Sequence, residues 1–297
     1  MSTMDDYQNN VEIQWCPGCP NFGILQAFKK ALVQLDKAPH EVCLVSGIGQ
    51  AAKLPHYLSC NFFNGLHGRA LPVALGIHVA NPELTTIVVT GDGDCYGEGG
   101  NHFIHTLRRN PDITVVVHNN EIYALTKGQA SPTTPRGETR ALQMRGVELA
   151  PLNAMAIAIL HGCGFVARGF AGDVEHLQGL LIEAISFRGF SYVDVIQPCI
   201  SWGTHPVSWY RERIYKIGDD YDPGNRDAAL EKSMERGEKM PIGVIYRAEP
   251  EEVFAGRYRK AVTDRPLPEL QPPDRDKIFE LLSEFREADV RKGGKDQ

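Results

Sequence analysis

Four short apolar runs, each followed directly by a polar segment rich in glycine or asparagine or by a Gln-Pro-Cys sequence, constrain the fold of this chain most. They span residues 42–45, 86–89, 113–117 and 192–196. Runs of β-branched residues with almost no polar interruption are typical of strands that are buried on both faces, as in a parallel sheet. We therefore expect these four runs to be strands of one parallel sheet.

Patterns typical of helices lie between and around these runs. They span residues 22–35, 69–80, 101–109, 153–160 and 174–187, and Asp173 is placed to cap the last of them. This alternation predicts an α/β fold with a doubly wound, mostly parallel sheet. Ligands of such sheets bind beyond the carboxyl ends of the strands. The polar segments all fall at those ends, so we expect them to form one site.

The chain is expected to form three regions: an N-terminal extension over residues 1–14, an α/β domain over 15–220, and an extended C-terminal arm over 221–297. The arm is rich in proline and charge, and it either wraps a partner, ending in a short helix near 276–290, or forms a loosely packed tail. Residues 127–147 lack periodicity and are longer than an ordinary connection, which indicates disorder or a functional loop.

Charge and hydropathy exclude several classes of protein. The net charge of −6 argues against nucleic-acid binding as the main function. No apolar run approaches the roughly 18 residues of a membrane span. Residues 1–14 carry acidic side chains and no apolar run, so they resemble neither a secretory signal nor a membrane anchor. The sequence favours a cytoplasmic protein.

A Gly-Asp-Gly-Asp sequence at residues 91–94 follows one predicted strand, and an Asn-Asn pair at 119 and 120 ends the next. Glycine lets the backbone approach phosphate oxygens closely. An aspartate there would repel phosphate unless a divalent cation lies between them, and Mg²⁺ commonly bridges carboxylates to phosphates. Each motif alone is common in turns. Together they resemble the thiamine-diphosphate motif, which implies Mg²⁺ on Asp92, Asn120 and the backbone oxygen of Ile122.

Seven cysteines in a chain without an export signal argue against a disulfide framework. The spacing of Cys16 and Cys19 allows two thiolates to face one metal centre, although a redox pair is an alternative. Cys199 follows the last strand, at the same edge of the sheet. For a fourth ligand we favour Cys60, which lies in an irregular stretch. Four scattered thiolates suit an iron–sulfur cluster near a redox cofactor, but spacing alone leaves zinc nearly even.

Six motifs in order resemble the β subunit of 2-oxoacid:ferredoxin oxidoreductases across residues 15–245. They are Trp-Cys-Pro-Gly-Cys at 15–19, Ser-Gly-Ile-Gly at 46–49, Leu-His-Gly-Arg-Ala at 66–70, the segments 91–94 and 125–133, and Gln-Pro-Cys at 197–199. The resemblance implies oxidative decarboxylation of a 2-oxoacid to acyl-CoA and CO₂, with electrons passing through a [4Fe-4S] cluster to ferredoxin, and the reverse reaction in some members. The thiamine cofactor is expected to bring about the cleavage that releases CO₂, and the protein is expected to orient the cofactor and the substrate.

The resemblance also implies ligands and exposes a departure. Cys16, Cys19 and Cys199 are implied cluster ligands. Many family members carry a further cysteine directly after Ser-Gly-Ile-Gly, where this chain has Gln50. Either Cys60 supplies the fourth ligand, as we expect, or one corner of the cluster is non-thiolate or vacant.

Further roles follow from the same resemblance. The implied thiamine-diphosphate contacts are Ser46, Gly47, Ile48, Gly49, His67, Gly68, Gly91, Asp92, Gly93, Asp94, Asn120 and Leu125. His67 is expected near the diphosphate or the reacting carbon. Lys53 and Lys127 are expected to pair with a substrate carboxylate or with coenzyme A phosphates.

Similarity around Gln50 favours 2-oxoglutarate as the substrate, with pyruvate as the alternative. The glutamate that activates thiamine is expected on an α subunit, in an (αβ)₂ assembly. Two other functions stay open: a non-redox thiamine-dependent decarboxylase or synthase, and a zinc-stabilised interaction subunit.

Overall fold

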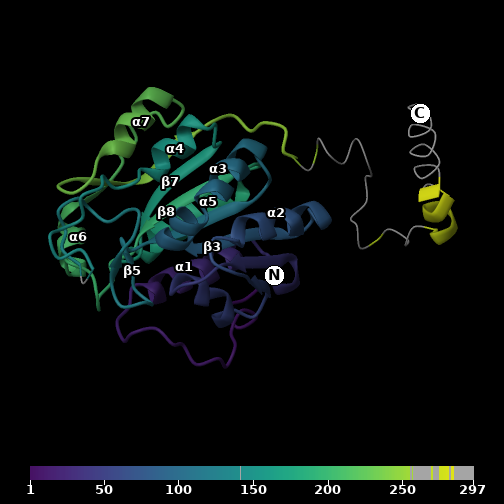
Figure 1. Ribbon diagram of the computed structural model, residues 1–297, viewed down its shortest axis with the longest axis horizontal. Coiled ribbons are helices and arrows are strands. Elements are labelled where there is room, and N and C mark those ends of the chain that lie inside the picture. Colours follow the sequence, from purple (N-terminus) through teal and green to yellow (C-terminus); the bar gives the residue numbers. More distant parts are fainter. Residues whose placement is uncertain (141, 255, 257–268, 270–273, 281, 284–297) are drawn as a thin grey trace, which may run out of the picture.

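The computed structural model describes residues 1–297 except 141, 255, 257–268, 270–273, 281 and 284–297. Within the described residues, the main sheet has eight strands in the order β2-β1-β3-β4-β8-β7-β10-β9. Their bounds are β1 Val42–Ser46, β2 Asn61–Asn64, β3 Thr85–Gly91, β4 Thr114–Asn119, β7 Phe165–Phe170, β8 Ser191–Ile196, β9 Ile214–Lys216 and β10 Met240–Arg247. The sheet runs through the middle of the molecule (Figure 1).

All neighbouring strands of this sheet pair in parallel except β7 and β10, which are antiparallel. The predicted α/β fold with a doubly wound, mostly parallel sheet is confirmed. A small hairpin of β5 (Ile122–Tyr123) and β6 (Gln129–Ala130) stands beside it.

Helices cover both faces of the sheet. Successive side chains of each strand point to opposite faces, so each strand packs against the helices on both sides. Against one face pack α1 (Asn21–Gln34) and α5 (Val174–Ser186), whose apolar residues share a buried cluster with β1, β3 and β8. A second cluster joins the other face to α2 (Ala70–Ala80), α3 (Gly100–Arg109), α4 (Ala154–Leu160) and α7 (Arg226–Met234). The remaining α6 spans Val207–Arg213.

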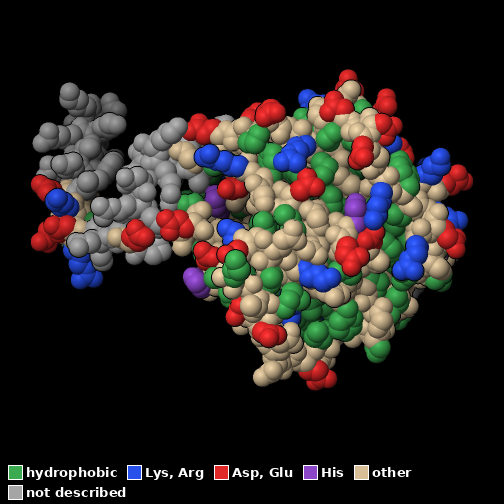
Figure 2. All heavy atoms as spheres, turned by 180° about the vertical axis from the view of Figure 1, so that it is seen from behind, with side chains coloured by type: hydrophobic (Ala, Val, Ile, Leu, Met, Phe, Trp, Pro, Cys, Tyr) green, Lys and Arg blue, Asp and Glu red, His purple; other side chains and the backbone are tan. Residues whose placement is uncertain are grey.

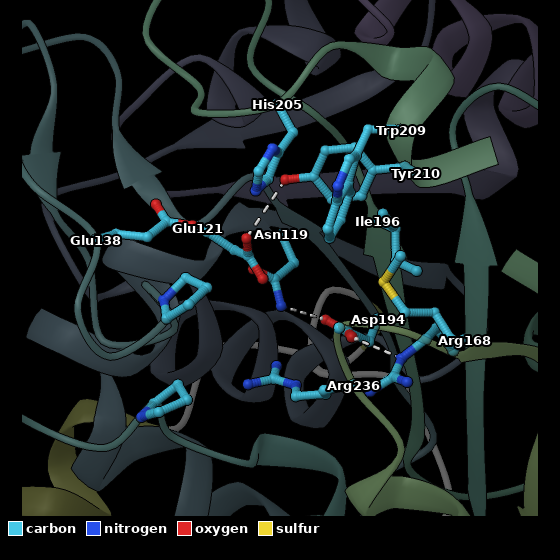
Figure 3. Close-up of a pocket in the computed structure, with 14 residues that line it drawn as sticks. Asn119, Glu121, Glu138, Arg168, Asp194, Ile196, His205, Trp209, Tyr210 and Arg236 are labelled. Atoms are coloured by element: carbon cyan, nitrogen blue, oxygen red, sulfur yellow. Dashed lines mark hydrogen bonds and ion pairs between the residues drawn. The ribbon is translucent and has the colours of Figure 1, made fainter. Parts of the chain in front are cut away.

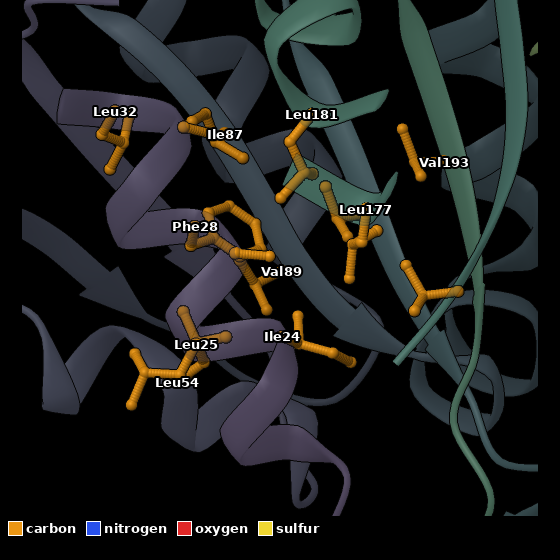
Figure 4. Packing of buried hydrophobic residues seen from close by; sticks show 14 of the residues in the cluster. Ile24, Leu25, Phe28, Leu32, Leu54, Ile87, Val89, Leu177, Leu181 and Val193 are labelled. Atoms are coloured by element: carbon orange, nitrogen blue, oxygen red, sulfur yellow. The ribbon is translucent and has the colours of Figure 1, made fainter. Parts of the chain in front are cut away.

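The first cluster shows how the sequence pattern becomes packing. Phe28 of α1 is fully buried and faces Ile87 and Val89 of β3 and Leu177 of α5 (Figure 4). Burying one such side chain contributes about 1.5–3 kcal/mol. Asp173 accepts a hydrogen bond from the backbone N–H of His176 and caps α5, as predicted.

The C-terminal region differs from its predicted form. The helix α7 and the strand β10 both lie beyond residue 220, and β10 pairs with β7 inside the sheet. The expected extended arm therefore does not begin at residue 221. Residues 275–280, 282 and 283 are helical, within and next to the predicted terminal helix, and the rest of that helix lies outside the described residues.

The N-terminal extension packs onto the α/β domain. Tyr7 is fully buried, its hydroxyl donates to the Lys37 carbonyl, and its own carbonyl accepts from the backbone of Ser59. Among described residues, no helix combines the length and the hydropathy needed to cross a membrane. On the face shown in Figure 2, acidic and basic side chains are interspersed, and no continuous basic area is visible.

Candidate active site

A cavity of about 110 Å³ lies at the carboxyl edge of the sheet, between the loops that follow β1, β3 and β4. Its lining contains Ile48, Gly49, Gln50, Ala51, His67, Gly91, Asp92, Gly93, Asp94, Asn120, Ile122, Tyr123, Ala124, Leu125 and Thr126. Segments far apart in the chain therefore meet as the sequence predicted, because parallel strands end at one edge.

Asp92 is buried at the base of this cavity. Its Oδ2 lies 2.5 Å from the Ser131 hydroxyl and 2.6 Å from the Thr133 hydroxyl, and its Oδ1 accepts from the Asn120 backbone N–H at 3.4 Å. Burial raises the pKa of Asp92, and these hydrogen bonds oppose that rise. A buried carboxylate is costly without a positive partner. The site is therefore suited to a cation.

Asp94 joins the loops around the cavity. It accepts hydrogen bonds from the backbone N–H groups of Ile48 and Gly68 and from the Thr90 hydroxyl, at 3.2, 2.9 and 2.8 Å. Its Oδ1 also lies 2.9 Å from Nδ1 of His67. One carboxylate thus ties together the segments after β1, before α2 and after β3.

Two glycines make this arrangement possible. A Cβ added at Gly47 would lie 2.1 Å from Oδ2 of Asp94. Gly68 has φ +65, and a Cβ there would lie 2.4 Å from the Glu98 backbone. Neither glycine lines the cavity, although both were predicted to contact the cofactor. Their role in the structure is to let other groups approach.

Ser46 was also predicted to contact the cofactor, but its side chain is buried and does not line the cavity. Its hydroxyl donates to the Ala52 carbonyl at 3.0 Å and accepts from the Asn64 side chain at 2.9 Å. Ser46 therefore fixes the loop that carries Ile48 and Gln50.

His67 stands at the mouth of the cavity, with 47% of its side chain exposed. Because Asp94 is an acceptor for every neighbouring donor, we assign the proton of a neutral His67 to Nδ1, which leaves Nε2 as an acceptor. Glu98 lies 3.7 Å from the same Nδ1. The carboxylates of Asp94 and Glu98 thus orient the ring through Nδ1, and Nε2 stays available to accept a hydrogen bond from a ligand.

Asn120 and Ile122 form a tight turn at the end of β4. The side-chain oxygen of Asn120 accepts from the Ile122 backbone N–H at 3.1 Å. An amide oxygen has two lone pairs, so one stays available for a cation. Gly93 allows the Tyr123 ring to close the cavity, since a Cβ at Gly93 would lie 2.4 Å from that ring.

A second cavity, of about 40 Å³, lies beside the first. Cys16, Cys19 and Cys199 line it together with Gln50, as the sequence predicted for the three thiols. The Ser201 hydroxyl donates to Sγ of Cys16 at 3.2 Å. Burial raises the pKa of Cys19 to about 11, and the neighbouring Cys199 and Cys16 thiols add to the rise. Among described residues, no three His, Cys, Asp or Glu side chains are placed to hold a single metal ion.

Cys60 does not join this group, contrary to expectation. It directly precedes β2, whose first residue, Asn61, pairs with Cys43 near the start of β1. Cys199 instead follows the end of β8, which runs parallel to β1 through the sheet. Cys60 therefore lies at the opposite edge, where burial and then the nearby Cys43 raise its thiol pKa to about 12. The sequence could not show which edge the turn before β2 reaches.

Neither lysine that was predicted to act in catalysis lines either cavity. Lys53 points its Nζ towards the Gln14 carbonyl, 3.5 Å away. Lys127 is exposed, at φ +75 in the turn of the β5–β6 hairpin. Their roles towards a substrate stay predictions.

Behind Asp92, a larger cavity of about 370 Å³ opens between β4, β8 and the loop before α6. Figure 3 shows its polar floor, where Asn119 donates to Asp194 at 3.0 Å and Asp194 pairs with Arg168 at 3.4 Å. Thr133, which contacts Asp92, also lies 2.9 Å from the Asn119 oxygen. A continuous chain of buried polar groups thus supports the carboxylate.

The sequence pattern did not reveal this supporting chain of polar groups. Ser131 and Thr133 lie in the 127–147 segment, whose length indicated either disorder or a functional loop, and their contacts with Asp92 favour the second. The only sign of this role in the sequence was that both residues carry hydroxyl groups that can donate hydrogen bonds to a carboxylate.

Two family models match the chain. Residues 45–195 match the family described as "Thiamine pyrophosphate enzyme, C-terminal TPP binding domain", and residues 199–262 match the C-terminal family of the pyruvate ferredoxin oxidoreductase beta subunit. The chain is 42% identical to a 2-oxoacid:ferredoxin oxidoreductase subunit beta of Aeropyrum pernix, covering 91% of this chain and 90% of that one. A protein of the same name from Saccharolobus solfataricus is also 42% identical, over 90% and 91% of the two chains.

A solved structure has the same fold. It is the 2-oxoglutarate:ferredoxin oxidoreductase from Magnetococcus marinus with 2-oxoglutarate, coenzyme A and succinyl-CoA bound, with a TM-score of 0.86 and 32% identity. The match covers 94% of this chain and 96% of that one.

Proposed function

Because this chain belongs to the β subunits of 2-oxoacid:ferredoxin oxidoreductases, we propose that it binds thiamine diphosphate and an iron–sulfur cluster and oxidises a 2-oxoacid to acyl-CoA and CO₂. The observation that carries the proposal is the buried Asp92 carboxylate, which lines the cavity and is held by the Ser131 and Thr133 hydroxyls and the Asn120 backbone N–H. It lies one loop away from three converging thiols.

The Asp92 cavity fits a diphosphate held through Mg²⁺. Asp92, the Asn120 side chain and the Ile122 backbone oxygen would hold the ion, since Mg²⁺ prefers hard oxygen ligands. When bound, thiamine diphosphate supplies the carbon nucleophile that attacks the 2-oxo group. Ile48 and Leu125 on the cavity wall provide apolar surface for the ring.

His67 acts at the mouth of the cavity in this proposal. Asp94 holds its Nδ1 proton, so Nε2 is left to accept a hydrogen bond or a proton from the substrate. Two roles are compatible with this position: orienting the substrate and accepting a proton.

The three thiols fit a [4Fe-4S] cluster at three of its corners, since each iron of such a cluster takes its own ligand. A cluster held by these thiols would supply one-electron transfer to ferredoxin. Three residues shared by the linings of the two cavities, Gln50, Asn120 and Ala124, form the wall between them. Short separation favours electron transfer across that wall.

An α subunit is expected to complete the site. The cavity of about 110 Å³ is smaller than the roughly 300–1,000 Å³ of ordinary ligand sites. Leu125 lines it, and Phe63 and Leu66 lie within four residues of the lining residue His67; these three apolar side chains are 47, 48 and 75% exposed and so offer surface that a partner can cover. A partner that covers them would bury apolar surface and supply the activating glutamate, in an (αβ)₂ assembly.

We propose 2-oxoglutarate as the substrate and coenzyme A as the acyl acceptor, with pyruvate as the alternative. Support comes from relatives named 2-oxoglutarate synthase subunit KorB, such as that of Archaeoglobus fulgidus at 41% identity over 62% of this chain. The Magnetococcus enzyme contains 2-oxoglutarate and succinyl-CoA. Lys53 and Lys127 are the candidate cations for the distal carboxylate or the coenzyme A phosphates.

The test uses the complex of this chain with its α subunit. Thiamine diphosphate, iron and acid-labile sulfide are measured per β subunit, and ferredoxin reduction is followed with each 2-oxoacid and coenzyme A. The proposal predicts all three components and faster reduction with 2-oxoglutarate. A colourless complex that decarboxylates without reducing ferredoxin would instead make the protein a non-redox thiamine enzyme.

A further inference from the structure

Gln50 has a buried amide oxygen that accepts no hydrogen bond. Leaving such an oxygen without a partner costs about 1–3 kcal/mol. Gln50 also lines both cavities, the one that contains Asp92 and the one that contains the three cysteines. An orphaned acceptor in this position indicates that a group with a hydrogen-bond donor or a metal ion binds between them.

The backbone holds Gln50 beside the thiols. Its carbonyl accepts from Nε1 of Trp15 at 2.9 Å, and Trp15 directly precedes Cys16. Trp15 is buried, and its ring packs edge-on against Tyr57, with centroids 4.8 Å apart. Gln50 and Cys16 are therefore both positioned by Trp15, and both line the same small cavity.

The other thiols of the chain are not placed to act there. Cys43 and Cys163 are buried in the second hydrophobic cluster, on the face of the sheet opposite α1, and Cys95 belongs to the same cluster. Cys60 lies at the far edge of the sheet. None of these four lines the cysteine cavity.

We propose that the Gln50 amide oxygen, rather than a thiolate, occupies the fourth corner of the iron–sulfur site, with Cys16, Cys19 and Cys199 at the other three. This inference rests on the proposed function, since it requires the cluster. The orphaned oxygen then gains an iron as its electropositive partner.

Two properties follow from this donor set. A neutral amide in place of a thiolate leaves the cluster one unit less negative, and net charge is one determinant of its potential. The reduction potential is therefore higher than that of the same site with four thiolates. The iron next to the amide is also the most weakly held, because thiolate is the better ligand for iron in such clusters.

The experiment compares Gln50→Cys, Gln50→Leu and Cys60→Ser with wild type in the αβ complex. Iron and sulfide content, the spectrum of the reduced cluster, its midpoint potential in a redox titration, and iron loss after mild oxidation are measured. Thiamine-diphosphate content and thermal unfolding report whether each variant folds.

We expect Gln50→Cys to keep its iron, lower the midpoint potential and slow iron loss severalfold. Gln50→Leu is expected to lose iron severalfold faster than wild type, and Cys60→Ser to behave as wild type. Unchanged potential and unchanged iron loss in both Gln50 variants would overturn the inference, as would loss of iron from Cys60→Ser. A wild-type complex without iron would instead refute the proposed function.

Discussion

The two cavities at the carboxyl edge of the sheet differ in how they are organised. Around Asp92 and Asp94, each carboxylate receives at least three hydrogen bonds from loops that the chain itself positions. Around the thiols, hydrogen bonds are fewer and longer: Cys16 accepts one from Ser201 at 3.2 Å, and Cys19 accepts one from the Gln197 side chain at 3.9 Å and one from the Asn21 backbone. The Gln50 amide oxygen has none. The first cavity is preorganised by hydrogen bonds from the protein. In the second, the thiols and the Gln50 oxygen line a cavity with few hydrogen-bond partners.

This difference suggests how each half is assembled. A preorganised site needs little rearrangement when its ligand binds, so its affinity is sensitive to small displacements of the supporting groups. In a site whose potential metal ligands have few hydrogen bonds, the positions of those side chains become fixed only when the metal group binds.

The largest effect is expected from Asp92→Asn, which removes the charge while keeping the shape. Wild type should gain about 2.7 kcal/mol of stability at ligand concentrations of 100 Kd, and the variant should gain none. Without Mg²⁺ and thiamine diphosphate, the variant should be as stable as wild type or more stable, because it no longer buries a carboxylate of raised pKa.

Thermal unfolding with and without both ligands measures this effect. The exposed Asp219 offers a matched control, since Asp219→Asn should respond to the ligands as wild type does. A normal ligand response in Asp92→Asn would refute the metal assignment.

A smaller loss is expected from Gly47→Ala. The added Cβ would lie 2.1 Å from Asp94 and must displace that carboxylate, at a cost typical of overpacking, about 1–3 kcal/mol. Gly76 in α2 is the control, because a Cβ there meets nothing within 4 Å, and Gly76→Ala should stabilise the helix by roughly 0.5–1 kcal/mol. Urea unfolding gives both values, and equal responses would show that Gly47 is not constrained by Asp94.

The smallest effect concerns pH. Burial lowers the pKa of His118 to about 3, so this side chain stays neutral in the folded protein while the unfolded chain takes up a proton near pH 6.5. Its contribution is fully present above pH 6.5 and falls as the pH drops, by about 1.4 kcal/mol between pH 7.5 and 5.5. Nδ1 of His118 lies 2.9 Å from Asn21, which lines the cysteine cavity.

His118→Gln should remove that part of the pH dependence. Urea unfolding at pH 7.5 and 5.5 measures it as the difference between variant and wild type, which cancels the contribution of other histidines. If the loss of stability between the two pH values is the same in both proteins, His118 does not stay neutral in the fold.

Local patterns predicted much of the fold. The strands β1, β3, β4 and β8 were predicted because each is a dense β-branched run. By contrast, β7 contains Ala167, Arg168 and Gly169, and β10 contains Pro241, so neither shows the same pattern, and both were missed. Their pairing is stabilised by tertiary contacts that no single segment reveals.

The candidate site divides in the same way. Asp92, Asn120 and Cys199 follow strand ends, so the rule that ligands bind at the carboxyl edge places them together. Cys16 and Cys19 precede α1 instead, and only their close spacing indicated a shared metal centre. The prediction of Cys60 as the fourth ligand failed because Cys60 precedes a strand, β2, and so lies at the other edge of the sheet. The sequence did not reveal that strand. The supporting hydroxyls of Ser131 and Thr133 come from a loop whose path depends on the complete fold.

The most direct test of the account is the cofactor content of two variants of the αβ complex, Asp92→Asn and Cys199→Ser. If the two cavities bind different groups at one sheet edge, Asp92→Asn should lose thiamine diphosphate and keep its iron and sulfide. Cys199→Ser should lose iron and keep thiamine diphosphate. Loss of both groups from each variant, or of neither, would contradict the assignment of two separate sites.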